Sequence, residues 1–377
     1  MRVLILSCNT GEGHNSAARA IAESLAGKGV ECDIRNALSY VPHFIEKLIC
    51  KGHLLAYREF PNIYGLGYKI AEKFRGRGAK SNFSDKRTKP WPKGLYDIVC
   101  GGRYDVVICV HVFAALMMKG IERKLEKKPL CCFVATDYTC SPGVASTSAD
   151  AYFIPHPKLT EEFLACGIEK GKLVPVGIPI SERFYRQSDR RAEKAALGIP
   201  EGKKIVLLMC GSMGCGPLRS LAEAFHKKRP SDAQMIVVCG TNRKLLKRLG
   251  KMKSDTVQAR GYTNEIAAYM DVADVILTKP GGLTTTETIA KGKPMILVEA
   301  VKGCETRNCV FLCNNGFAQK ADSVADAIGL LNNELNCPDG TDDKNSTRPY
   351  MPRKAADQIA DYLLGLSSRI ENMCEIC

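Results

Sequence analysis

Three ionisable residues follow short apolar runs or a glycine turn in this sequence. His14 closes the turn GEGH after the first run, His111 ends DVVICVH, and Asp137 ends LCCFVATD. Because the carboxyl ends of parallel strands meet at one edge of a sheet, these side chains are expected to converge. A histidine with an ordinary pKa of about 6.5 can remove a proton near neutral pH. The expected chemistry is general-base catalysis.

Glycine-rich turns that lead into helices are the candidate phosphate sites. Gly11 and Gly13 lie in the first of them, where backbone N–H groups and a helix dipole favour an anion. A complete dinucleotide fingerprint would need glycine at Ser16, which argues against a dehydrogenase. Two motifs in the second half of the chain repeat this arrangement, MCGSMGCGP at 209–217 and TKPGGLTTTETIAKGKPMIL at 278–297.

The longer motif carries a residue suited to a ribose. Thr284 and Thr285 are predicted to open a helix, with Glu287 on its first turn, where a carboxylate can accept both hydroxyls of a ribose. Asp-x-Asp does not occur in the chain, so no metal-bridged diphosphate is implied. Helix N-termini and backbone donors are then expected to stabilise the charge on a departing diphosphate.

The elements that position these groups form an α/β pattern. Short apolar runs alternate with helical patterns, which predicts parallel sheets with crossover helices. A helix is predicted over Ser16–Gly27, capped by Asn15 or Ser16. The predicted strands are Arg2–Ser7, Glu31–Asn36, Val106–His111, Leu130–Asp137 and Ala151–Pro155, then Lys204–Cys210, Met235–Cys239, Thr256–Ala259, Val275–Thr278 and Pro294–Val298.

This pattern predicts two Rossmann-like domains facing a cleft. The first covers 1–180, with an insertion at about 42–94, and the second covers 203–335. The charged, turn-rich stretch Ser181–Gly202 is the predicted hinge. A polar loop and a closing helix, roughly Pro352–Ser368, make up 338–377.

Charge indicates an acidic partner. The formal net charge is +14, and the insertion carries a basic tract next to apolar residues at helical spacing. This composition favours docking on an anionic membrane, with a solvated basic loop as the alternative. Nucleic-acid binding is not favoured, because few aromatic residues interleave with the basic ones. The basic residues singled out for membrane contact are Arg75, Arg77, Lys80, Arg87 and Lys89.

The cysteines and the hydropathy of the chain indicate its cellular compartment and its relation to the membrane. Eighteen cysteines are spread along an α/β pattern, many inside apolar strands, which fits a reducing cytoplasm. The pair Cys374 and Cys377 has no second pair at zinc-finger spacing, so no metal site is expected. Without a signal peptide or a stretch long enough to span a bilayer, any membrane contact is expected to be peripheral, at the cytoplasmic face.

Seven motifs together resemble one family. They are LSCNTGEGHNSAARAI, VICVH, VATDY, VGIPISERF, LLMCGSMG, VVCGTNRKL and KPGGLTTTETIAKGKPMIL. The chain resembles the monogalactosyldiacylglycerol synthases and processive diacylglycerol β-glucosyltransferases of glycosyltransferase family 28, from Val3 to about Phe317. Their C-terminal domain is shared with the peptidoglycan N-acetylglucosaminyltransferase. The resemblance implies a GT-B fold and inverting transfer of glucose or galactose from a UDP-sugar to diacylglycerol. Independently of it, the missing Asp-x-Asp leads us to expect no metal or other cofactor.

The resemblance also implies roles for individual residues. His14 would be the base toward the diacylglycerol hydroxyl, and Asp137 would orient it. From their place at the glycine turn and a strand end, Gly11, Gly13 and His111 are expected to line the acceptor or a phosphate. Cys304 stands where the family usually has glutamine, so the identity of the sugar stays open. The implied donor-binding residues are Gly211, Ser212, Met213, Gly214, Gly261, Tyr262, Lys279, Pro280, Gly281, Gly282, Thr284, Glu287, Glu305 and Asn308.

Two other functions stay open from the sequence. One is N-acetylglucosaminyl transfer in cell-wall precursor synthesis, which uses the same kind of donor domain. The other is a basic binding protein without catalytic activity, against which the presence of His14, Asp137 and Glu287 argues.

Overall fold

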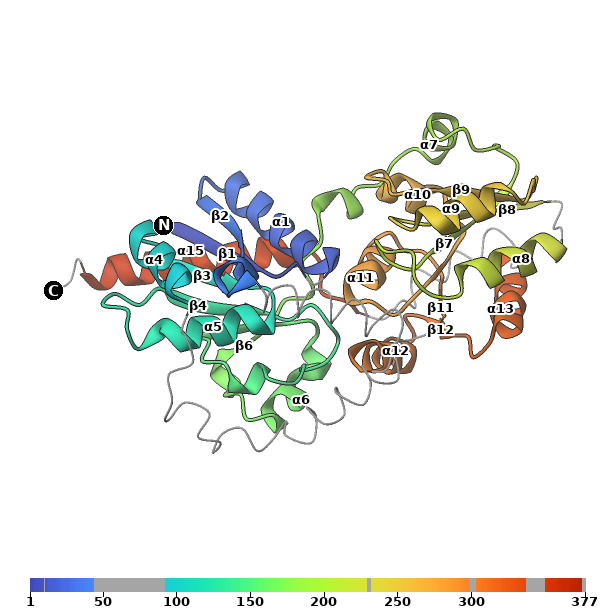
Figure 1. Cartoon of the computed structure of the whole chain (residues 1–377). Coiled ribbons are helices and arrows are strands. Elements are labelled where there is room, and N and C mark those ends of the chain that lie inside the picture. The colour runs from blue at the N-terminus through green and yellow to red at the C-terminus, as the bar shows by residue number, and fades with distance from the viewer. Residues whose placement is uncertain (10, 44–91, 229–231, 299–302, 337–349, 375–377) are drawn as a thin grey trace. The chain divides into compact units, whose positions relative to one another are not determined.

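The computed structural model describes residues 1–9, 11–43, 92–228, 232–298, 303–336 and 350–374. These residues form two compact units (Figure 1). The first comprises Met1–Ser181, Lys302–Cys304 and Pro352–Cys377, and the second comprises Glu182–Val301 and Glu305–Met351.

The first unit is built on a six-stranded parallel sheet in the order β2-β1-β3-β4-β5-β6. Val3, Leu4, Ile5 and Leu6 of the central strand β1 have no exposed surface. Both faces of such a strand are covered, so its sequence is continuously apolar instead of alternating. The strands are β1 (Arg2–Ser7), β2 (Glu31–Asn36), β3 (Val106–Cys109), β4 (Leu130–Val134), β5 (Ala151–Ile154) and β6 (Leu173–Pro175).

Helix α1 begins earlier than the sequence predicts. It runs over Glu12–Gly27, not Ser16–Gly27, and Gly11 is its N-cap. The predicted cap Asn15 lies inside the helix instead, where its Oδ1 accepts a hydrogen bond from Ser7 Oγ at 2.6 Å. The start of α1 therefore has no side-chain cap.

The C-terminal helix α15 (Ala355–Cys374) packs in the first unit, against α1. Ser24 Oγ donates to Asp357 Oδ1 at 2.5 Å. Ile359 and Leu363 lie in the same apolar core as Val3 and Ile5. Among the described residues, the other helices of this unit are α4 (Lys93–Gly102), α5 (Val112–Glu122) and α6 (Thr160–Ala165).

The second unit repeats the architecture with the sheet order β12-β11-β10-β7-β8-β9, again all parallel. Its strands are β7 (Lys204–Met209), β8 (Ala233–Val238), β9 (Val257–Arg260), β10 (Val275–Thr278), β11 (Met295–Leu297) and β12 (Gln319–Lys320). Its helices are α7 (Arg190–Ala196), α8 (Leu218–Lys228), α9 (Arg243–Gly250), α10 (Ile266–Val272), α11 (Gly282–Ala290), α12 (Cys304–Asn314) and α13 (Val324–Asn336).

The predicted α/β class is confirmed, with differences at strand ends. The predictions Arg2–Ser7, Glu31–Asn36 and Val275–Thr278 match the observed strands. Strand β3 stops at Cys109, two residues before His111, because His111 already caps the next helix. Strands β6 and β12 were not predicted; with three and two residues, they are too short to show a periodic pattern.

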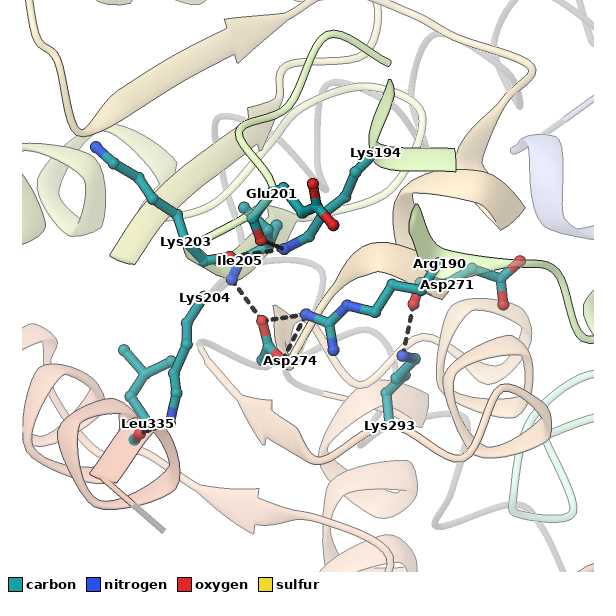
Figure 2. Close-up of polar contacts among 10 residues, drawn as sticks. All are labelled: Arg190, Lys194, Glu201, Lys203, Lys204, Ile205, Asp271, Asp274, Lys293 and Leu335. Atoms are coloured by element: carbon teal, nitrogen blue, oxygen red, sulfur yellow. Dashed lines mark hydrogen bonds and ion pairs between the residues drawn. The ribbon is translucent and has the colours of Figure 1, made fainter. Parts of the chain in front are cut away.

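The segment predicted as a hinge is fastened to the second unit at several points. Arg190 Nη2 donates to both carboxylate oxygens of Asp274 at 2.6 Å, and Asp274 Oδ2 also accepts from the backbone N–H of Ile205 (Figure 2). Lys194 is 5% exposed and donates to the carbonyls of Glu201 and Lys203. Helix α7 is thus an integral part of this unit and not a free linker.

Candidate active site

His14 lies in the first turn of α1, directly after β1. Its Nδ1 is 2.9 Å from the carbonyl oxygen of Val110 and 3.2 Å from Thr136 Oγ1. A carbonyl oxygen only accepts, so Nδ1 carries the hydrogen and Nε2 keeps its lone pair in the neutral ring. The structure therefore assigns Nε2 as the nitrogen able to take a proton.

Burial changes the basicity of this histidine. It lowers the pKa of His14 to about 4, partly opposed by the hydrogen bond to Val110. The expectation of a pKa near 6.5 is wrong for this environment, because desolvation penalises the charged ring. His14 is neutral at pH 7 and hence ready to accept a proton, but it holds that proton less tightly than an exposed histidine would.

His111 is brought against His14, as expected. The ring centroids are 4.6 Å apart with an interplanar angle of 78°, an edge-on contact. His111 is the N-cap of α5, and its Nδ1 accepts the backbone N–H of Phe113 at 3.0 Å. In the neutral ring its hydrogen then sits on Nε2, the opposite tautomer to that of His14.

Asp137 lies three residues beyond the end of β4 and is half-buried. Its carbonyl accepts the N–H of Thr139 at 2.7 Å. The neighbouring Thr136, only 7% exposed, supplies the hydroxyl contact to His14. Sequence reasoning missed Thr136 and Val110. A polar residue just beyond an apolar strand could have indicated Thr136, but nothing in a sequence marks a single backbone carbonyl.

The start of α11 has the features of an anion-binding site. Strand β10 ends at Thr278, Gly281 is the N-cap, and no side chain caps the helix. The hydroxyls of Thr285 and Thr286 bond back to glycine carbonyls of the same turn. The first backbone N–H groups of a helix have no partner within the helix, and they lie at the positive end of its dipole.

Glu287 stands on the second turn of α11 and not on the first, because the helix begins at Gly282. Burial raises the pKa of its carboxyl to about 7, while the positive charge of Arg183 opposes the rise. A carboxylate in this setting gains from any ligand that donates hydrogen bonds to it.

Lys279 and Glu305 form a buried ion pair. Lys279 Nζ lies 3.1 Å from Glu305 Oε1, and each side chain is 9% exposed. Asn308, on the next turn of α12, is fully buried and donates to the carbonyl of Pro280 at 2.9 Å. The expected donor residues of the KPGG turn and of α12 are therefore joined directly to each other.

The glycine loop after β7 is shaped by backbone packing. Gly214 has φ +58°, and a Cβ there would lie 2.0 Å from the carbonyl oxygen of Cys239. A Cβ on Gly240 would lie 2.1 Å from the carbonyl of Ser212, which accepts from Thr241 N–H at 2.8 Å. The loop thus needs glycine to pack against its neighbour, a reason separate from phosphate binding. Gly211 is exposed and Met213 half-buried.

The remaining predicted residues of the second unit lie at the same sheet edge. Gly261 directly follows β9 and packs near Leu246. Tyr262 is 55% exposed. The donor-site candidates thus follow the carboxyl ends of β7, β9 and β10, which is where ligands bind in open parallel sheets.

The predicted membrane residues Arg75, Arg77, Lys80, Arg87 and Lys89 lie outside the described residues. Within the described part of the chain, no helix is both long and apolar enough to cross a bilayer.

Two family profiles match the chain in sequence. Residues 14–180 match the profile of monogalactosyldiacylglycerol (MGDG) synthase, and residues 205–315 match the glycosyltransferase family 28 C-terminal domain. His14 and the KPGG turn fall inside these matches. The catalytic and donor candidates thus lie in segments that match these two profiles.

Named relatives cover most of the chain. A processive diacylglycerol beta-glucosyltransferase of Staphylococcus saprophyticus is 24% identical over 392 residues, covering 99% of this chain and 95% of the relative. One of Bacillus cereus strain B4264 is 27% identical over 325 residues, covering 84% and 81%. The similarity therefore extends over both units.

Solved structures share the fold. MurG of Acinetobacter baumannii superposes with a TM-score of 0.58 at 15% identity, covering 98% of this chain and 99% of its own. The UDP-GlcNAc 2-epimerase of Neisseria meningitidis, bound to UDP-GlcNAc, gives 0.60 at 14% identity, covering 97% and 100%. These likenesses, with the two parallel sheets, show the two-domain α/β fold of the GT-B class, as predicted.

Proposed function

Because this chain belongs to the family of monogalactosyldiacylglycerol synthases and processive diacylglycerol glucosyltransferases, we propose that it transfers a hexose from a UDP-sugar to the hydroxyl of diacylglycerol. The observation that carries the proposal is the environment of His14. The carbonyl of Val110 fixes its tautomer and leaves Nε2 as the basic nitrogen. A general base toward a hydroxyl nucleophile needs such an unprotonated nitrogen.

In the proposed reaction His14 acts on the acceptor. As the hydroxyl oxygen of diacylglycerol attacks the anomeric carbon, its proton passes to Nε2 of His14. The bond between that carbon and the β-phosphate oxygen breaks, and UDP leaves with the electron pair. A single displacement of this kind inverts the anomeric configuration. The low pKa of His14 favours prompt release of the proton afterwards.

The second unit supplies the proposed donor site. The uncapped start of α11 faces the diphosphate with its N–H groups and dipole. The carboxylate of Glu287 accepts the ribose hydroxyls. We propose that these groups stabilise the leaving UDP without a metal ion. The support for this is the absence of an Asp-x-Asp motif from the sequence.

The hexose is proposed to be glucose ahead of galactose, because the relatives are named glucosyltransferases. Lys279 and Glu305 form an ion pair, which holds the Glu305 carboxylate in one position. Any hydrogen bond between the sugar and Glu305 is then made at that position. Cys304 precedes this pair and offers no amide to the sugar.

The proposed acceptor, diacylglycerol, is a membrane lipid, so the enzyme has to act at a lipid surface. We propose that the basic insertion at about 42–94 docks the enzyme on an anionic membrane at its cytoplasmic face. The support is the net charge of +14 and the basic residues grouped in that part of the sequence.

Purified protein incubated with diacylglycerol vesicles and radiolabelled UDP-glucose, UDP-galactose or UDP-N-acetylglucosamine tests the proposal. A labelled glycolipid formed from UDP-glucose, fastest of the three, is the expected result. Turnover of UDP-N-acetylglucosamine alone would favour the cell-wall alternative. Binding of UDP without transfer from any donor would favour a protein that binds but does not catalyse.

A further inference from the structure

The loop that follows β4 is buried although it is neither helix nor strand. It runs from Thr136 to Cys140, and apart from the half-buried Asp137 its residues are at most 7% exposed. Buried N–H and hydroxyl groups cost stability unless they find acceptors, so such a loop depends on the groups that bond to it. This loop carries Asp137, and its first residue contacts His14.

Glu162 on α6 holds the far end of this loop. Its Oε1 accepts hydrogen bonds from Thr139 Oγ1 at 2.6 Å and from the backbone N–H of Cys140 at 3.1 Å. Thr139 is also tied back to Asp137, whose carbonyl accepts the Thr139 N–H at 2.7 Å. Glu162 is half-buried, and the next residue, Phe163, has no exposed surface. The carboxylate is thus presented to the loop by a helix that is anchored in the core.

The near end of the loop is held against the proposed base. Thr136 Oγ1 lies 3.2 Å from His14 Nδ1. Just before it, the N–H of Ala135 donates to the carbonyl of Phe153 at 3.0 Å. Asp137 lies between this end and the bonds to Glu162. Because so short a segment is fixed at both ends, its position beside His14 depends on both sets of bonds.

We propose that Glu162 is a positioning residue for the acceptor part of the site. Through the loop Thr136–Cys140 it keeps Thr136 in contact with His14 and fixes the place of Asp137. The inference rests on the proposed function, because it requires His14 as the base. Groups that support the reacting residues in this way decide how well a site is pre-organised.

Loss of the Glu162 carboxylate would leave the Thr139 hydroxyl and the Cys140 N–H without their acceptor, and both belong to buried residues. The loop is then expected to shift, and Thr136 with it. The donor site is proposed in the second unit, so the Kd of UDP should not respond. A fall in kcat at constant Kd of UDP separates positioning from a general loss of folded protein, which would lower both the rate and the UDP-binding capacity.

The first test compares Glu162→Ala with Glu162→Gln, which keeps an oxygen to accept both bonds. Full-length proteins are assayed with UDP-glucose and diacylglycerol vesicles, and calorimetry gives the Kd and the binding capacity for UDP. We expect kcat to fall about tenfold in Glu162→Ala, since a small misplacement of reacting groups can cost up to about a hundredfold. Most of this loss should be recovered in Glu162→Gln.

A second pair of variants acts from the loop side and keeps the test decisive if Glu162→Ala does not fold. Thr139→Val removes the hydroxyl that Glu162 accepts and nearly preserves the volume of the side chain, whereas Thr139→Ser keeps the hydroxyl. We expect kcat to fall in the valine variant and to stay near the parent value in the serine variant. Equal rates in the two variants would overturn the inference.

NMR of ¹⁵N-histidine-labelled protein follows the contact itself. The Nδ1 resonance of His14, assigned from its loss in His14→Ala, should move in Glu162→Ala and Thr139→Val and stay in place in Thr139→Ser. His226 in the second unit, whose Nδ1 lies 2.8 Å from Ser254 Oγ, is the internal reference and should not move. An unchanged His14 resonance in both loss variants would also overturn the inference. If the parent transfers no hexose, the proposed function fails, and this spectrum still decides whether Glu162 holds the loop against His14.

Discussion

The carbonyl oxygen of Val110 lies 2.9 Å from Nδ1 of His14 and thereby decides which nitrogen of that ring can act as a base. Thr136 contacts the same nitrogen at 3.2 Å. In many catalytic sites a carboxylate fixes the tautomer of the histidine. Here a neutral carbonyl and a hydroxyl do so, and they add no negative charge to hold a proton on the ring. This is consistent with the low pKa of His14.

His14→Ala is expected to lower kcat by about a hundred- to ten-thousand-fold, the usual size of general-base catalysis. UDP binding should be retained, because its proposed site lies in the second unit. Asp137→Asn should cause a smaller loss if Asp137 only orients the base. Steady-state kinetics with calorimetric UDP binding checks all three statements. A normal kcat with a raised KM for the donor in His14→Ala would move the base to His111 or Asp137.

Thr136→Val tests the positioning contact separately, with Thr136→Ser as the matched control that keeps the hydroxyl. We expect kcat to fall several-fold in the valine variant and to recover in the serine variant, with little change in the donor KM. The pH profile of kcat is the second readout, because loss of the contact changes the environment of Nδ1. Equal effects of both substitutions would indicate a packing role.

Glycine turns and strand ends leave clear signals in a sequence, and from them the candidate site residues could be named. His14, His111 and Asp137 were expected to converge, and the contact between the two histidine rings confirms this for two of the three. Their protonation was not predictable, since the burial of His14 depends on packing from distant parts of the chain. The place of Glu287 within its helix was also missed, because the start of α11 is set by the Pro-Gly-Gly turn and not by the threonines that follow. Likewise, no local pattern shows that α15 packs on α1, more than 300 residues away.

Metal removal is expected to leave activity intact. Helix dipoles and backbone N–H groups provide the proposed stabilisation of UDP, and the sequence has no Asp-x-Asp. The measurement is the initial rate with UDP-glucose after dialysis against EDTA, compared with the rate after adding back magnesium or manganese. Activity that is lost in EDTA and returns only with one of these ions would contradict the mechanism.

Neutralising Arg75, Arg77, Lys80, Arg87 and Lys89 together should weaken membrane binding. Each basic residue near an anionic surface contributes on the order of 1 kcal/mol. Sedimentation with anionic vesicles should therefore fall steeply, while the weak binding to zwitterionic vesicles changes little. The control variant neutralises five exposed lysines or arginines of the second unit. It loses the same total charge, so it shows whether the effect depends on where the charges lie. Equal loss in both variants, or no loss in either, argues against a docking role for the insertion.

Asp274→Ala is expected to destabilise the second unit. It removes the partner of Arg190 and an acceptor for the N–H of Ile205 (Figure 2). Because Arg190 is 44% exposed, solvent screens part of the effect, and we expect a loss of roughly 1–3 kcal/mol in unfolding free energy. Urea denaturation measures it. Arg190→Ala should cost less, and the double variant should cost less than the sum of the two.

Donor affinity should depend on the protonation of Glu287. Its pKa is raised from about 4.5 to about 7 in the folded protein, so the folded state binds the extra proton between these values. This proton contributes to stability at low pH, and the contribution is lost as pH rises toward 7. The affinity for ribose changes with pH in the opposite direction and rises as pH rises. The reason is that only the ionised carboxylate accepts hydrogen bonds from both hydroxyls. With about a tenth of Glu287 ionised at pH 6, the Kd should be roughly tenfold weaker than at pH 8.

Uridine is the ligand for this measurement, because it has no phosphate that titrates in the same range. The Kd is followed by NMR titration from pH 6 to pH 8 in the parent and in Glu287→Gln. The variant should bind weakly at every pH and lose the dependence, since the amide does not ionise. A parent Kd that stays constant across this range would remove Glu287 from the ribose site. A dependence that persists in the Glu287→Gln variant would assign the titration to another group.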